Sequence, residues 1–118
     1  MVVPNGTLSQ ESTLYAFCAL RKCTDGAVSL SAVVLDTQGN IFGTTEVGGT
    51  QRGAGSGGGV VFELSGSNYQ VVHKFCTQKN CPNGSYPNFI IRDNSGHFFG
   101  TTIGGGNSND GTIFEMFP

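Results

Sequence analysis

The chain has 118 residues, six of them basic and eight acidic, and a formal net charge of −2. This balance argues against a nucleic-acid partner, because neutralising phosphates requires a basic face. No apolar run approaches the roughly 18 residues that a membrane-spanning helix needs, and residues 1–12 lack the basic start and apolar stretch of an intact secretion signal. We therefore expect a protein with no nucleic-acid partner and no membrane span.

The most informative feature is an internal duplication. The stretch "GNIFGTTEVGG" (39–49) agrees with "GHFFGTTIGGG" (96–106) at seven of eleven positions. Upstream, "FCALRKCTDG" matches "FCTQKNCPNG" 58 residues later, and downstream "GVVFEL" matches "GTIFEM" 52 residues later. A period of this size is typical of stacked repeats. We divide the chain into an N-terminal segment, 1–12, and two repeats, 13–70 and 71–118.

Each repeat contains four short segments that favour strands, because they are rich in β-branched and aromatic residues and are bounded by turn-forming residues. In chain order these segments are 13–17, 32–35, 41–45 and 60–64, then 71–75, 89–92, 98–102 and 112–116. Phe62 and Leu64 share one face of the 60–64 segment and Glu63 takes the other, as a period of two requires.

The segments 36–40 (DTQGN) and 93–97 (DNSGH) predict tight turns, since Asp can bond its own backbone and Gly accepts a positive φ. Gly43 and Gly100 predict a close approach by a neighbouring backbone or large side chain. No stretch has a capped helical pattern. The predicted fold class is all-β, with two four-stranded antiparallel blades like those of a β-propeller; a β-sandwich is the alternative.

The ordered motifs resemble a known family. The pattern D-x-x-G-[NH]-[IF]-F-G-T-T, a Gly-rich loop and G-[VT]-[VI]-F-E-[LM] occur in this order in each repeat, between residues 13 and 116. They resemble the GloVer tandem repeat of bacterial proteins. The resemblance implies a secreted or surface-anchored repeat protein and a location that is extracellular or at the cell surface, without implying an activity.

Four cysteines form two C-x4-C pairs, Cys18 with Cys23 and Cys76 with Cys81. We expect one local disulfide in each repeat, which would require an oxidising compartment. A four-thiolate zinc site and free thiols are the alternatives. Structural zinc sites more often use C-x2-C, and repeat geometry normally holds equivalent positions apart.

Residues 53–58 match the dinucleotide-binding pattern G-x-G-x-x-G. That fingerprint needs a helix after the loop, but a strand is expected here, and the second repeat lacks the pattern. We therefore predict no cofactor and interpret 46–59 as a mobile, exposed loop.

Neither a catalytic set nor a metal site is predicted. His73 and His97 do not occupy equivalent positions, and the acidic residues follow the repeat pattern, so no Ser-His-Asp group or isolated acid pair is evident. The protein is therefore not expected to be an enzyme.

Residues near the cysteine loops suggest a candidate glycan-binding site, because aromatic and amide or carboxylate side chains in loops suit sugar recognition. These residues are Asp25, Asn83, Tyr86 and Asn88. Asn5 and Asn83 also begin N-glycosylation sequons.

The expected function is that of a non-enzymatic extracellular β-repeat module that self-assembles into a ring or filament. The 13–17 segment of one chain would complete the last blade of the next, alongside 112–116, with Phe17 and Phe114 at the contact. The alternatives are a glycan-binding lectin-like module and a secreted propeller hydrolase or lyase.

Overall fold

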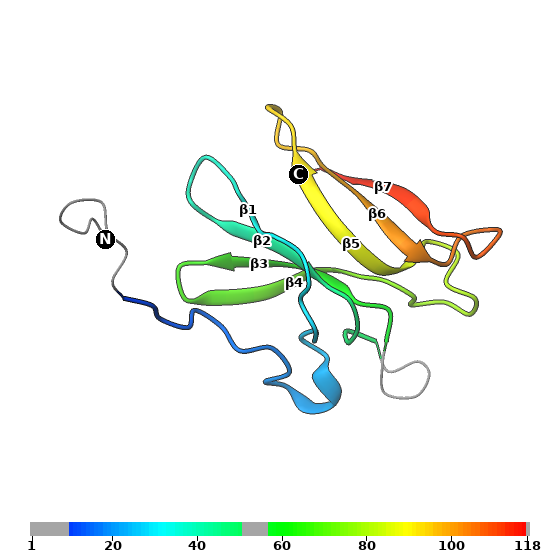
Figure 1. The fold of residues 1–118 in the computed structure, drawn as a ribbon, viewed down its shortest axis with the longest axis horizontal. Helices are drawn as coiled ribbons and strands as arrows, with labels where there is room; N and C mark the ends of the chain where they lie inside the picture. Colours follow the sequence, from blue (N-terminus) through cyan, green and yellow to red (C-terminus); the bar gives the residue numbers. More distant parts are fainter. Residues whose placement is uncertain (1–9, 51–56, 118) are drawn as a thin grey trace.

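The computed structural model describes residues 10–50 and 57–117, and this part of the chain is all-β. One sheet has the order β1-β2-β3-β4 and the other the order β5-β6-β7, and every strand pairing is antiparallel. The strands of the first sheet (sheet 1) are β1 (Val34–Leu35), β2 (Ile41–Thr45), β3 (Val60–Ser65) and β4 (Asn68–Lys74). The strands of the second sheet (sheet 2) are β5 (Ser85–Arg92), β6 (Phe98–Gly104) and β7 (Thr112–Met116). Figure 1 shows the two sheets adjoining along β2 and β5.

The all-β prediction is confirmed, but the structure corrects its details. Residues 13–17 form no strand, and sheet 2 has three strands in the described part of the chain rather than four. β4 pairs with the edge of β3 that does not pair with β2. The 13–17 segment adds no strand and packs against sheet 1 through Tyr15 and Phe17. Because β4 spans the predicted boundary at residue 70, the first strand of the second repeat completes the sheet of the first. The described residues close neither a barrel nor a propeller.

The predicted hairpin turns are confirmed. Asp36 Oδ1 accepts hydrogen bonds from the backbone N–H groups of Gln38 and Asn40 at 2.8 and 2.9 Å, and Gly39 has a φ of 83°. Donation from the Asn40 side chain to Oδ2, together with these backbone bonds, holds the pKa of Asp36 below its ordinary value. Asp93 repeats the arrangement in the β5–β6 turn.

The hydrophobic core lies between the two sheets. Val61, Phe75 and Ile90 are buried at its centre. Partly buried apolar side chains surround them: Val34, Phe42, Val72, Phe98, Phe114 and Met116. The sheets therefore bury one face of sheet 1 against one face of sheet 2.

The duplicated stretch has a packing role that explains its glycines. A Cβ on Gly43 would lie 2.6 Å from Cζ of Phe62, and one on Gly100 would lie 2.6 Å from Cζ of Phe114. The predicted close approach is thus confirmed, and in each repeat it is made by the phenylalanine of the neighbouring strand. Of the 46–59 loop, residues 51–56 lie outside the described residues, and β3 follows it as predicted.

Candidate interaction surfaces

Each repeat carries one disulfide, as predicted. Cys18 pairs with Cys23 and Cys76 with Cys81, which leaves no free cysteine in the described residues. The described residues also include no cluster of three or more His, Cys, Asp or Glu side chains arranged to hold a metal ion. The two disulfides indicate an oxidising environment.

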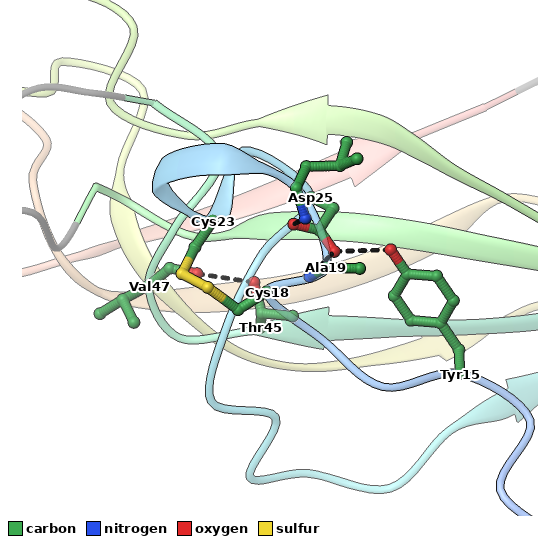
Figure 2. Close-up of a disulfide and its surroundings, with 8 residues drawn as sticks. Tyr15, Cys18, Ala19, Cys23, Asp25, Thr45 and Val47 are labelled. Atoms are coloured by element: carbon green, nitrogen blue, oxygen red, sulfur yellow. Dashed lines mark hydrogen bonds between the residues drawn. A yellow bond between two sulfur atoms is a disulfide. The ribbon is translucent and has the colours of Figure 1, made fainter.

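The carboxylate of Asp25 joins the loop of the first disulfide to the Tyr15 side chain (Figure 2). Its carboxylate is buried, and Oδ2 accepts hydrogen bonds from Tyr15 Oη at 2.5 Å and from the Ala19 N–H at 2.9 Å. The Leu20 N–H donates to Oδ1 at 3.1 Å. Burial alone would raise the pKa of Asp25, but these donors outweigh it and lower the pKa below its ordinary value. The Tyr69 hydroxyl, from β4, donates to the backbone carbonyl oxygen of Asp25.

An aromatic cluster accompanies this hydrogen-bond network. The rings of Tyr15 and Tyr69 are stacked, with centroids 3.8 Å apart and an interplanar angle of 5°. Phe17 packs edge-on against Phe62 at 5.1 Å and 62°. Burial, the hydrogen bond to Asp25 and the charge of that carboxylate raise the pKa of Tyr15 to about 12. No local sequence pattern pairs Tyr15 with Tyr69, because the two residues are distant in sequence and meet only in the folded chain.

The equivalent place in the second repeat is a cavity of about 440 Å³ beside β7. Phe75 packs against Phe114 at 5.1 Å and 63°, which repeats the geometry of the first pair, and His73 lies edge-on to Phe75 at 4.6 Å. Asn83 and Met116 also line the cavity. Desolvation lowers the pKa of His73. Phe114, predicted to lie at an assembly contact, is thus half-buried at the wall of an open site.

A second cavity, of about 450 Å³, lies between the two hairpin turns. Phe42, Val72 and Phe98 contribute apolar side chains to it, and the charged residues Asp36 and Arg92 also line it. None of these side chains belongs to a nucleophile–base–acid arrangement of the kind that hydrolysis requires.

Sheet 2 exposes apolar side chains on the face that points away from sheet 1, here called the outer face of sheet 2. Ile113 is 84% exposed, and Phe89, Ile91 and Ile103 are also exposed. Val61, which occupies the position of Ile113 in the first repeat, is only 1% exposed. Apolar side chains exposed together on one sheet mark a candidate interaction site.

The candidate glycan-binding residues have different surroundings. Asp25 is 1% exposed and its carboxylate is enclosed by the chain, so a glycan in solution does not reach it. Asn83 is exposed and lines the cavity beside β7. Tyr86 and Asn88 lie on β5, where the Asn88 carbonyl accepts a hydrogen bond from Thr44. Of the two sequon asparagines, Asn83 is exposed and Asn5 lies outside the described residues.

Within the described residues, no helix is long and apolar enough to cross a membrane. Comparison with protein families, curated proteins and solved structures found no match. The fold and the surfaces described above are therefore the basis on which a function is assigned.

Proposed function

We propose that this protein is a non-enzymatic, extracellular β-repeat module that assembles head to tail with further copies of itself. The observation that carries the proposal is the contrast between Val61 and Ile113. These residues occupy the same position in β3 and β7, yet the first is 1% exposed and the second 84% exposed. Sheet 2 covers Val61, and in the described residues nothing equivalent covers Ile113.

The occupant we propose for the outer face of sheet 2 is sheet 1 of a second copy. Within one chain, sheet 2 covers sheet 1 with Ile90, which is buried and lies close to Gly100. The equivalent residue of sheet 1, Val33, lies close to Gly43 and is 48% exposed. The exposed face of sheet 1 that contains Val33 is therefore equivalent to the face of sheet 2 that contains Ile90 and packs against sheet 1.

Such a contact joins two different faces, so it is heterologous. It closes into a ring when the rotation between copies allows and grows into a filament otherwise. Successive sheets stacked in this way would resemble the blades of a propeller, in agreement with the resemblance to the GloVer repeat. The two disulfides support the extracellular location, because such bonds persist in oxidising compartments.

The proposed contact between sheet faces differs from the sequence-based expectation, in which the 13–17 segment of one chain adds a strand to the last blade of the next. Residues 13–17 form no strand, and Phe17 packs against Phe62 of its own chain. A polar substitution of Phe17 is therefore expected to weaken the fold rather than the contact between copies.

The proposal is tested by sedimentation velocity over a range of micromolar concentrations. We expect the wild-type protein to self-associate and Ile113→Lys to remain monomeric, because the charged side chain would be desolvated at the contact. Leu30→Lys is the matched control, since Leu30 is 74% exposed and lies outside sheet 2. A wild-type protein that stays monomeric throughout, or two variants that behave alike, would contradict the proposal.

A further inference from the structure

We propose that the outer edge of β7 and the adjoining 440 Å³ cavity form a peptide-binding site. The site takes an extended peptide as an added β-strand and accepts a tyrosine side chain of that peptide in the cavity. This inference concerns the edge of sheet 2, whereas the proposed self-assembly uses its outer face; Ile113 belongs to both, because it also lines the cavity.

In the first repeat, the place equivalent to this cavity is filled by the Tyr69 side chain of β4. There β4 pairs with β3, and Tyr69 lies opposite Leu64. The Tyr69 ring stacks on Phe62 with centroids 5.6 Å apart and on Tyr15 at 3.8 Å. Its hydroxyl donates to the carbonyl oxygen of Asp25.

The positions that contact Tyr69 in the first repeat line the cavity beside β7 in the second, and the same residue type recurs at the two phenylalanines. The contacts of Tyr69 are Tyr15, Phe17, Asp25, Phe62 and Leu64. The residues at the equivalent positions of the second repeat are His73, Phe75, Asn83, Phe114 and Met116, and all of them line the cavity.

The wall of the cavity is already in its binding geometry. Phe75 and Phe114 meet at 5.1 Å and 63°, and Phe17 and Phe62, which hold Tyr69, meet at 5.1 Å and 62°. A preorganised apolar wall loses little conformational entropy when a ring enters. Asn83 occupies the position of Asp25 in the second repeat and lines the cavity, so its backbone carbonyl is the proposed acceptor for the tyrosine hydroxyl.

The edge of β7 supplies the backbone partners. β3 pairs with β2 on one side and β4 on the other, whereas β7 pairs with β6 and with no other strand in the described residues. An unpaired edge of this kind binds extended peptides through main-chain hydrogen bonds, and pockets beside it select the side chains.

The register of β4 on β3 predicts how the peptide lies. A peptide with the β4 sequence would place its tyrosine opposite Met116 and the first of its two valines opposite Phe114. The N-terminal segment of this chain carries Glu11 at the position of Tyr69. A carboxylate is costly to desolvate beside Phe75 and Phe114, so the site selects tyrosine over this segment.

The test uses the intact protein and a fluorescently labelled peptide, SNYQVVHKF, which copies residues 67–75. We expect saturable binding by fluorescence anisotropy and a ring-current shift of the His73 imidazole protons by NMR. Replacing the peptide tyrosine by Ala or Glu should weaken binding by about tenfold or more, since ring stacking and burial are lost. These changes are made in the peptide, so the fold of the protein is not at risk.

A peptide N-methylated at alternate residues tests the strand pairing separately, because it keeps its side chains but loses main-chain donors. It is expected to bind weakly. Absence of binding up to millimolar peptide, or equal binding by the native, Ala and N-methylated peptides, would overturn the inference. Sedimentation with and without peptide separates the two proposals: peptide binding by a protein that stays monomeric would support the edge site and contradict self-assembly, and self-association of a protein that binds no peptide would do the reverse.

Discussion

Thr44 donates a hydrogen bond from Oγ1 to the carbonyl oxygen of Asn88 at 2.9 Å, which joins β2 of sheet 1 to β5 of sheet 2. Ser31 lies 3.1 Å from the same hydroxyl and donates to it, since the Thr44 proton is already used. Thr44 is 2% exposed, whereas its equivalent in the second repeat, Thr101, is exposed. The contact between sheets is therefore fixed by a polar link as well as by apolar packing.

This link predicts a difference between two otherwise matched substitutions. Thr44→Val should lower the free energy of unfolding by about 1 kcal/mol, because the Asn88 carbonyl and the Ser31 hydroxyl lose their partner. Thr101→Val, at the exposed equivalent position, should change it by less than about 0.5 kcal/mol. Urea denaturation followed by circular dichroism measures both. Equal effects would show that the hydrogen bond to Asn88 contributes nothing.

Asp25 predicts a pH dependence of stability. Its pKa is lower in the folded protein than in the unfolded chain, so its contribution is complete above the unfolded value, about 3.9, and is lost as the pH falls through the folded value. Asp25→Asn should reduce stability at pH 7 and flatten the loss of stability below pH of about 4. Denaturation series at several pH values measure this slope. An unchanged acid slope in the variant would contradict the assignment.

The disulfides predict a modest stabilisation. The four cysteines have positive φ angles of 48–61°, a conformation that non-glycine residues rarely adopt without a constraint. Replacing Cys18 and Cys23 together by Ser should lower the free energy of unfolding by about 2 kcal/mol, because the closed loop is short. Non-reducing mass mapping should find the Cys18–Cys23 and Cys76–Cys81 links. A Cys18–Cys76 link, or stoichiometric zinc, would contradict this pairing.

The longer glycine-rich loop predicts where deletion is tolerated. Removing five residues from within 51–56 gives the first repeat the loop length of the second and should leave the folded state intact. Removing Gly58 and Gly59 should prevent folding, because their carbonyls accept hydrogen bonds from the Tyr86 and Phe75 N–H groups at 2.8 and 3.0 Å. The yield of soluble protein and its thermal midpoint check both deletions. Loss of folding after the first deletion would show that residues 51–56 are packed.

Features that depend on neighbouring residues are predictable from the sequence alone. Strand-favouring composition between turn residues located Ile41–Thr45, and alternation with a period of two supported Thr112–Met116, both with the bounds that the structure has. The turns at Asp36 and Asp93 followed from side-chain bonds to backbone groups two and four residues on. The disulfides followed because paired cysteines five residues apart meet through local geometry.

Which strand and which face each segment contacts depends on packing between residues that are distant in sequence. Residues 13–17 have strand composition, but Tyr15 is held by Asp25 and also by Tyr69, which is distant in sequence. Val61 and Ile113 stand in nearly the same local sequence, yet one is buried and the other is exposed. Burial depends on whether another sheet covers the residue, and no local pattern contains that information.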